Sequence, residues 1–184
     1  DIALQHNRNI FEILDLVNRD YKRAGLKPPG LTGGPCLYKD GFFLVARHPV
    51  NDLISAAWKV NEGVPTILVD ELQKHISLRG TKTALLGLTF KKNIDDDRHS
   101  LSHEVYQLLK NKGSEVRLHD PFLRKGDLGK LLPDVDVIMI CTNHDFYRKL
   151  GLDGLRKLAR PDTLVCDIWN SFGTGRLVYL LREV

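Results

Sequence analysis

The sequence predicts an α/β protein in which a helical segment and a long connecting helix precede a doubly wound parallel sheet. Before about residue 78, apolar side chains recur mostly at helical steps of three and four residues. From Lys82 onward, short apolar runs alternate with helical patterns, which is typical of a parallel sheet covered by helices on both faces. We therefore expect two domains, residues 1–78 and residues 79–184.

The N-terminal part is predicted to contain two helices joined by a loop. The first helix covers about residues 10–17 and ends before Gly25. Glycines and prolines dominate residues 27–35, so this segment is expected to be a loop. Residues 50–77 carry an apolar helical stripe. Such a helix is about 40 Å long at a rise of 1.5 Å per residue, which is more than one small domain needs.

The C-terminal part is predicted to be a regular alternation of strands and helices. Strands are expected at residues 84–88, 115–119, 136–141 and 163–167. Helices are expected near residues 105–109, 124–132, 152–159 and 176–182. Apolar runs as short as these are typical of strands that are buried on both faces, as the strands of a parallel sheet are.

The composition is that of an ordinary globular protein, with 42% hydrophobic and 27% charged residues. No window of eighteen apolar residues predicts a membrane span, and the N-terminus does not resemble a secretory signal. A net charge of +4 suits an anionic ligand. A nucleic-acid-binding domain is an alternative that the charge alone supports. Three widely spaced cysteines argue against a disulfide framework and a zinc site, and they favour a reducing cytoplasm.

A first candidate site is the segment from Gly33 to Asp40, which contains Cys36. Gly33 and Gly34 allow the backbone to approach a ligand closely and leave N–H groups free to stabilise a thiolate or an oxyanion. Lys39 adds positive charge near the thiol, whereas Asp40 opposes that effect and could orient a water molecule. Cys36 is therefore a candidate nucleophile in a Gly/Pro loop, and the alternative is a small apolar packing residue.

A second candidate site is the segment of residues 87–100, which directly follows the first predicted strand of the sheet. Ligands bind at the carboxyl ends of strands in such sheets. Lys91 and Lys92 could bind a phosphate there, and Arg98 could bind a second anion; the alternative is a solvated, charged loop. Gly87 stands alone and forms no G-x-G-x-x-G motif, so this part is not expected to hold a dinucleotide in the usual way.

The remaining candidates are weaker. The acidic residues 95–97 do not have the spacing of a calcium-binding loop, and no metal site is expected. His144 follows the third predicted strand and could line the same edge as Lys91, or it could be an ordinary loop histidine. Cys141 and Cys166 lie in apolar strands and are expected to be buried packing residues.

These motifs resemble the UDP-glucose/GDP-mannose dehydrogenase family of nucleotide-sugar 6-dehydrogenases. The family motif around its nucleophile, close to G-G-x-C-x-P-K-D, is similar to residues 33–40. The family pattern G-L-x-F-K-x-x-x-D-D-x-R-x-S matches residues 87–100 position by position, and T-x-H-x-x-F resembles residues 142–146 with one residue deleted. The form Gly-Gly-Pro-Cys is most similar to the branch that acts on UDP-N-acetylhexosamines.

The resemblance implies a Rossmann-like UDP-binding domain and oxidation of the sugar C6 alcohol to a carboxylate. Cys36 is implied to form a thiohemiacetal and then a thioester, and Asp40 to help activate the hydrolytic water. Arg98 is implied to reach the NAD cofactor. The residues implied to bind the nucleotide sugar are Tyr21, Arg23, Gly33, Gly34, Lys39, Phe90 and Lys91.

The family pattern also implies a homodimer formed through the helix at residues 50–77 and a role in polysaccharide biosynthesis. NAD is implied to be bound mainly by an N-terminal domain that these 184 residues do not contain, so we expect this chain alone to be inactive. Two positions depart from the family: Tyr38 stands where Pro is usual, and Trp169 stands where Arg is frequent. These departures keep a non-catalytic nucleotide-sugar binding module as an alternative.

Overall fold

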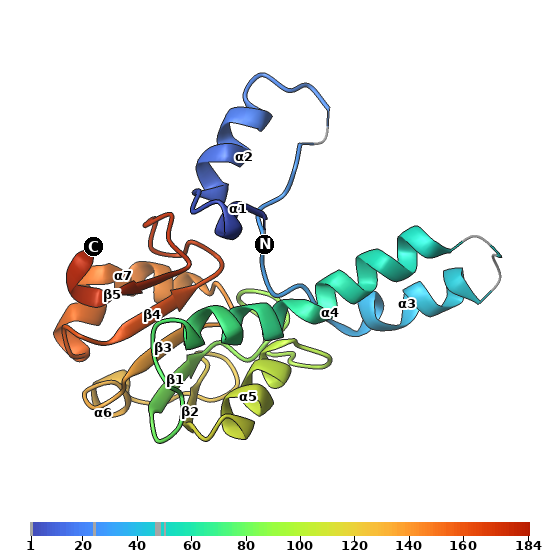
Figure 1. Ribbon diagram of the computed structural model, residues 1–184. Helices are drawn as coiled ribbons and strands as arrows, with labels where there is room; N and C mark the ends of the chain where they lie inside the picture. Colours follow the sequence, from blue (N-terminus) through green and yellow to red (C-terminus); the bar gives the residue numbers. More distant parts are fainter. Residues whose placement is uncertain (1, 24, 47–48, 50) are drawn as a thin grey trace.

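A computed structural model describes residues 2–23, 25–46, 49 and 51–184, and its C-terminal part is a five-stranded sheet (Figure 1). The strands are β1 (Lys82–Leu86), β2 (Glu115–His119), β3 (Val137–Ile140), β4 (Leu164–Asp167) and β5 (Val178–Leu180). Their order is β2-β1-β3-β4-β5. The first four strands are parallel and β5 is antiparallel to β4. The predicted mostly parallel α/β sheet is confirmed. The helix predicted at residues 176–182 is wrong, because that segment forms β5 and a 3-10 turn.

Helices cover both faces of this sheet. They are α4 (Asp52–Gln73), α5 (Ser102–Asn111), α6 (Leu128–Leu131) and α7 (Asp145–Leu158). Leu72 of α4 and Val105 of α5 pack with Leu85 on one face. Leu155 of α7 packs with Leu86 on the other face, where α6 also contributes. Adjacent residues of β1 thus enter opposite cores, which explains why the predicted strands are apolar without alternation.

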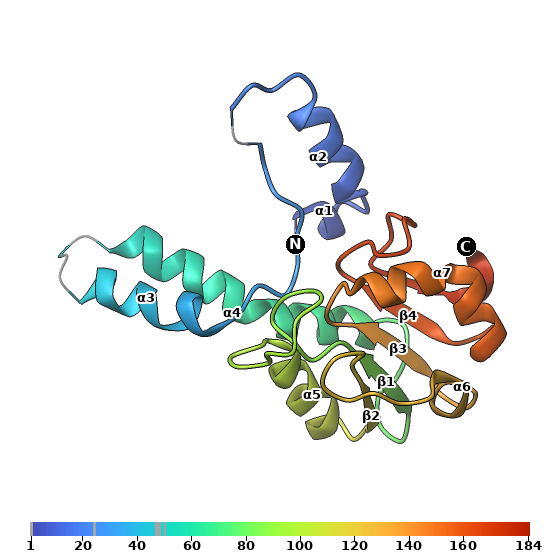
Figure 2. The ribbon, with the colours of Figure 1, turned by 180° about the vertical axis from the view of Figure 1, so that it is seen from behind.

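The helix α4 belongs to two parts of the molecule. Leu68, Val69 and Leu72 near its C-terminal end are buried against the sheet. Its N-terminal half pairs with α3 (Pro35–Val45), and the two helices project from the α/β part as an antiparallel hairpin in both views (Figures 1 and 2). The helix predicted at residues 50–77 is confirmed with shorter bounds.

The helix α3 corrects the expectation of a Gly/Pro loop around Cys36. Pro35 occupies the first turn of the helix, where its missing N–H costs nothing because that group has no intrahelical partner. Gly34 precedes it as the N-cap residue with φ of 109°, a conformation that favours glycine. Cys36 therefore lies in the first turn of a helix.

The N-terminal segment contains α1 (Ile2–Gln5) and α2 (Ile10–Asn18). The Asn9 side chain caps α2 by accepting the Phe11 N–H. After α2 the Asn18 side chain bonds to both backbone groups of Leu26, at 2.8 and 2.9 Å, and so closes the connecting loop. None of the helices within the described ranges is long and apolar enough to cross a lipid bilayer.

The carboxyl ends of β1 and β3 form the position where the strand order reverses. The chain leaves β1 for β2 on one side and later enters β3 on the other side of β1. Open α/β sheets bind ligands at such a point. Gly87, with φ of 94°, lies directly after β1, and a Cβ there would be 2.5 Å from the backbone nitrogen of Thr142. The segments that follow β1 and β3 therefore leave the sheet side by side.

Candidate functional site

The two segments that carry the candidate residues meet in the structure. The Gly34 N–H donates to the carbonyl oxygen of His99 at 3.0 Å. A Cβ on Gly33 would lie 2.5 Å from the same oxygen, and a Cβ on Gly34 would lie 2.7 Å from the Phe90 ring. Both glycines are thus required by close packing against the segment that follows β1. This packing places the N-terminal end of α3 beside the loop that bears Lys91.

A ring stack adds to this contact. Tyr38 of α3 lies parallel to His99, with 4.1 Å between ring centroids and an interplanar angle of 9°. His99 itself has φ of 54°, which turns its backbone carbonyl toward Gly34. Tyr38, which stands where the family usually has Pro, therefore fixes α3 against the second segment.

Cys36 is exposed, whereas Cys141 and Cys166 are buried. This distribution confirms the contrast between the cysteines that the sequence predicts. Burial raises the pKa of the Cys141 thiol well above its usual value, and burial together with the nearby Asp167 charge raises the pKa of Cys166. The two strand thiols are therefore poor nucleophiles.

Arg98 lies within electrostatic range of the Cys36 thiol. Its guanidinium makes a paired contact with Asp96, Nε to Oδ1 at 3.0 Å and Nη2 to Oδ2 at 2.7 Å. Hydrogen bonds from Arg98 lower the pKa of Asp96 to about 2. The pKa of Arg98 is raised, chiefly by its hydrogen bonds with Asp96 and by the charge of that carboxylate. The structure thus brings the candidate cofactor residue and the candidate nucleophile together.

The other predicted site residues of the N-terminal part are exposed. Lys39 and Asp40 lie on the second turn of α3. Tyr21 and Arg23 follow α2, on a segment that projects away from the sheet (Figures 1 and 2). No described contact joins these two residues to Phe90 or Lys91, so their role in substrate binding stays a prediction.

The segment after β1 presents two lysines to solvent. Lys92 lies 3.5 Å from a carboxylate oxygen of Asp145. The backbone carbonyl of Lys91 accepts a hydrogen bond from Thr89 Oγ1 at 2.8 Å, which fixes the main chain beneath its side chain. The Lys91 ammonium is thus carried on an ordered turn at the carboxyl edge of the sheet.

Beneath this turn lies a buried polar cluster that the sequence did not reveal in full. His144 is fully buried and pairs with Asp120, which is also fully buried. The sequence left His144 open as a loop residue and did not single out Asp120 at all. The sequence carries one indication that Asp120 belongs to the site. This residue directly follows the strand β2 and so lies at the same edge of the sheet as His144.

A second buried carboxyl group, Asp167, lies at the end of β4. It lines a mostly apolar cavity of about 420 Å³ between α1, α2, α4 and the sheet. Its Oδ1 has no described hydrogen-bond partner, and its Oδ2 accepts the Phe172 N–H at 3.2 Å. Burial raises the pKa of Asp167 to about 6, and hydrogen bonds from its own loop only partly oppose the effect.

Trp169 packs over Gly30 close to this point. A Cβ on Gly30 would lie 2.2 Å from the indole ring. The indole Nε1 donates to the carbonyl oxygen of Cys141 at 3.0 Å. Trp169 therefore fills the position where the family often carries Arg, and it joins the loop before α3 to the sheet.

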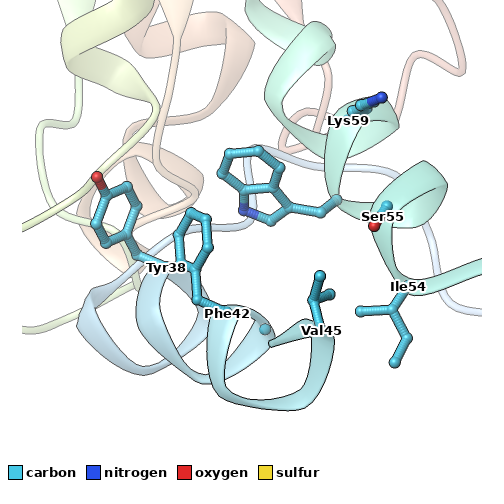
Figure 3. A pocket seen from close by; sticks show the side chains of 8 residues that line it. Tyr38, Phe42, Val45, Ile54, Ser55 and Lys59 are labelled. Atoms are coloured by element: carbon cyan, nitrogen blue, oxygen red, sulfur yellow. The ribbon is translucent and has the colours of Figure 1, made fainter. Parts of the chain in front are cut away.

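The hairpin of α3 and α4 encloses a small apolar cavity of about 180 Å³. Phe42 and Trp58 meet edge to face across it, with 5.3 Å between ring centroids. Figure 3 shows side chains from both helices pointing toward this space. Outside the cavity, large apolar side chains are exposed on the same two helices, including Phe43 at 70% and Leu53 at 83%. This apolar surface continues beyond the hairpin's own contacts.

Within the described ranges, no group of three His, Cys, Asp or Glu side chains is placed to hold a metal ion. The cationic groups at the carboxyl edge, Lys91 and Arg98, suit phosphate oxygens. The candidate site therefore combines an exposed thiol in the first turn of α3 with exposed cationic side chains on the segment against which that helix end packs.

Comparison with known proteins agrees with this arrangement. Residues 84–174 match the UDP-binding domain of the UDP-glucose/GDP-mannose dehydrogenase family. The chain is 29% identical over 163 residues to the UDP-N-acetyl-D-mannosamine dehydrogenase of Methanocaldococcus jannaschii, which covers 86% of this chain and 38% of that protein. It is 30% identical over 173 residues to the Pyrococcus horikoshii enzyme of the same name. That alignment covers 89% of this chain and 41% of the other protein.

The solved structure of a UDP-D-ManNAc dehydrogenase from Pyrococcus horikoshii superposes with a TM-score of 0.78 at 29% identity, covering 86% of this chain and 40% of that one. The chain spans about two fifths of the length of these relatives. Because the fold, the motif positions and the sequence comparisons agree, residues 84–174 are identified as a UDP-binding domain of the UDP-glucose/GDP-mannose dehydrogenase family.

Proposed function

We propose that this chain is the C-terminal portion of an NAD-dependent dehydrogenase that oxidises the C6 alcohol of a UDP-sugar to a carboxylate. The observation that supports this most is the packing of Gly33 and Gly34 on Phe90 and His99. It places the exposed Cys36 next to the anion-binding turn, so one nucleotide sugar can contact both. The names of the relatives favour a UDP-N-acetylhexosamine as the substrate.

In the proposed reaction, Cys36 holds the partly oxidised sugar covalently. Its sulfur adds to the carbonyl carbon of the C6 aldehyde and gives a thiohemiacetal. Loss of a hydride from C6 and of the proton from its hydroxyl group converts the thiohemiacetal to a thioester. Water, oriented with the help of Asp40, then cleaves the carbon–sulfur bond and releases the carboxylate and the free thiol. Covalent capture keeps the reactive aldehyde at the site and divides a difficult oxidation into easier steps.

Two molecules of NAD, bound one after the other, would each accept one of the two hydrides that this oxidation releases. Arg98, exposed and near Cys36, is the residue of this chain that we propose contacts the cofactor. The chain contains no G-x-G-x-x-G motif, so we propose that NAD is bound mainly by residues outside these 184. We accordingly expect the 184-residue chain alone to produce no NADH from UDP-sugars, and NADH formation by the purified chain would contradict this proposal.

The nucleotide is proposed to lie at the carboxyl edge of the sheet with its diphosphate on Lys91. We expect Lys91→Ala to weaken UDP binding by about 1.5 to 3 kcal/mol, because a charge-assisted hydrogen bond is lost. Isothermal calorimetry with UDP measures this. Lys112→Ala is the matched control, since Lys112 follows α5 at the opposite edge of the sheet. Unchanged affinity of Lys91→Ala, with a wild type that binds UDP, would remove Lys91 from the site.

The alternative, a nucleotide-sugar binding module without catalysis, draws its support from Tyr38 and Trp169. Both side chains are built into packing contacts here, on His99 and on Gly30. Substitution of Cys36 distinguishes the dehydrogenase from the non-catalytic binding module. When the chain is supplied as part of its whole protein, Cys36→Ser should abolish carboxylate formation and leave UDP binding intact. A whole protein that binds UDP-sugars and forms no product even with NAD would favour the module.

We also propose that the projecting hairpin pairs with a second copy of the chain. Large apolar side chains exposed on α3 and α4, such as Phe43, Leu53 and Val60, form a surface that one molecule leaves uncovered. An isologous contact would bury this surface on both copies at once. The family resemblance favours the same state.

A further inference from the structure

A buried hydrogen-bond cluster lies directly beneath the turn that carries Lys91. Asp120 and His144 are both fully buried. Asp120 Oδ2 lies 3.1 Å from His144 Nε2 and accepts the Leu88 N–H at 2.7 Å. Its Oδ1 accepts two backbone N–H groups from the loop that follows β2. Burial alone would raise the pKa of Asp120, but the hydrogen bonds from His144 and from the backbone outweigh it and hold that pKa well below its usual value. The carboxylate is therefore an anionic acceptor.

The bonding partners determine which nitrogen of His144 carries the proton. The backbone N–H of Asn93 points at Nδ1, 2.9 Å away. Because a backbone amide can only donate, Nδ1 bears the lone pair and Nε2 bears the hydrogen. Nε2 faces Asp120 Oδ2 and also Thr89 Oγ1, at 3.2 Å. The Thr89 hydroxyl in turn donates to the carbonyl of Lys91. One neutral ring thus holds residues 89 and 93, which flank Lys91 on both sides.

The outer side of the turn is also fixed. Asn93 adopts a left-handed backbone with φ of 60°, which is unfavourable for a residue with a side chain unless its surroundings hold it. Its amide group donates to Asp145 Oδ2 at 2.6 Å, and its side-chain oxygen accepts the Asp145 N–H at 3.1 Å. Asn93 is therefore held from inside by His144 and from outside by Asp145. The turn is therefore held by hydrogen bonds from this chain itself.

We propose that His144, supported by Asp120, is a positioning residue that holds the turn so that Lys91 meets the diphosphate without prior ordering of the loop. A binding group on a fixed backbone loses less conformational entropy on binding than one on a mobile loop. This inference rests on the proposed function, in which Lys91 contacts the diphosphate of UDP.

Two substitutions separate the two bonds of the His144 ring. His144→Gln can keep a donor near Asp120 but removes the acceptor for the Asn93 N–H. His144→Asn places an amide oxygen near the former Nδ1 and keeps that acceptor. The matched control is His119→Gln, because His119 is also buried at this edge but its Nδ1 pairs with the hydroxyl of Tyr147 at 2.9 Å.

The first measurement is UDP affinity by calorimetry on the full chain. We expect His144→Gln to weaken binding about tenfold, His144→Asn to restore most of that loss, and His119→Gln to stay within about twofold of the wild type. In a Lys91→Ala background, His144→Gln should have no further effect, because it acts through Lys91. Equal losses for the histidine variants, or additive losses with Lys91→Ala, would overturn the inference.

The second measurement needs no ligand and therefore separates this inference from the proposed function. Nitrogen NMR shifts of the His144 ring should show Nδ1 without and Nε2 with the proton, and the Asn93 amide should exchange slowly with solvent. His144→Gln should speed that exchange and His119→Gln should not. If the wild type does not bind UDP, the proposed function fails. A fast Asn93 amide in the wild type refutes the positioning role itself.

If His144→Gln does not fold, Asp145→Ala tests the same turn from its exposed side. This change frees the Asn93 side chain and leaves the buried pair intact. It should speed exchange of the Asn93 amide. It should also weaken UDP binding several-fold when Lys91 is intact, and have no effect on UDP binding in a Lys91→Ala background. An Asp145→Ala chain with wild-type exchange and affinity would contradict the inference.

Discussion

At the scale of single residues, the site depends on how closely two backbones approach at Gly34. This residue combines φ of 109° with a position where a Cβ would lie 2.7 Å from the Phe90 ring. A side chain there is unfavourable both for the backbone and for packing. The geometry that packs the N-terminal end of α3 against the segment carrying Lys91 thus depends on the absence of a side chain at one position.

We expect Gly34→Ala to lower the free energy of unfolding by about 1 to 3 kcal/mol, through strain at positive φ and displacement of Phe90. Urea denaturation measures the change. Gly41→Ala is the control, because Gly41 lies inside α3 and a Cβ there meets no atom within 4 Å. That variant should gain up to about 1 kcal/mol from helix propensity. A Gly34→Ala chain as stable as the wild type would show that the contact is not as close as described.

The three cysteines provide a second prediction at this scale. Under native conditions, iodoacetamide should label Cys36 first, because Cys141 and Cys166 are buried and their pKa values are raised. Peptide mass spectrometry gives the rates, and labelling in denaturant confirms that all three thiols can react. Equal native rates would contradict the strand positions, and an unlabelled Cys36 would contradict its role as a nucleophile.

Residues differ in how far the sequence reveals them. The contrast between Cys36 and the two strand cysteines follows from local pattern, since apolar neighbours indicate burial. Asp120 has no such pattern, because an aspartate after a strand is common in α/β proteins. Its importance arises only when donors from Leu88, His144 and its own loop converge on one carboxylate. Long-range contacts of this kind are not encoded in a short motif.

At the scale of elements, the four parallel strands β1 to β4 are the part that the sequence predicts best. The strand predicted at residues 115–119 is observed with the same bounds. The α3 helix was missed because two glycines and a proline at its start suggest a loop, although Pro suits a first helical turn. Residues 178–180 were predicted to be helical and form β5 instead. That strand exists because it pairs with the edge of β4, a contact far away in the sequence.

The hairpin of α3 and α4 gives a prediction about assembly. Light scattering at micromolar concentration should show a dimer, and Phe43→Glu should shift it to monomer by placing a charge in the apolar contact. The matched control is Phe122→Glu, since Phe122 is 41% exposed on the α/β part and lies outside the hairpin. A monomeric wild type, or dissociation by both variants alike, would contradict pairing through this surface.

At the scale of the whole molecule, stability should depend on pH through the buried Asp167. Its pKa is raised from 3.8 to about 6 in the folded chain. The folded state then binds more protons than the unfolded state between those values, so stability falls as pH rises from about 4 to 6. The full effect is about 3 kcal/mol. Groups whose pKa values are lowered in the folded chain, Asp120 and Asp134 among them, have the opposite effect on stability. The stability that they contribute is lost as the pH falls.

A variant isolates that contribution. Asp167→Asn keeps an oxygen for the Phe172 N–H and removes the titration. Urea unfolding at pH 4.5 and at pH 7.5 should show that the substitution is more favourable, or less unfavourable, at the higher pH by about 2 kcal/mol, since the carboxyl group of the unfolded chain is already partly ionised at pH 4.5. An equal effect of Asp167→Asn at both pH values would mean that the carboxyl group titrates normally.

The helix α4 connects the hairpin to the sheet, because its C-terminal end packs on the sheet and its N-terminal half packs on α3. Leu72 at one end is fully buried, and Leu53 at the other end is 83% exposed. The 22 residues of α4 correspond to a length of about 33 Å, and Pro65 interrupts the backbone hydrogen bonding between the anchored half and the free half. Over that length a small rotation of the anchored end against the sheet becomes a larger displacement at the free end, and α3 moves with it through the aromatic contact of Phe42 and Trp58. Bending of α4 at Pro65 would consequently change the position of Cys36 relative to the turn that carries Lys91.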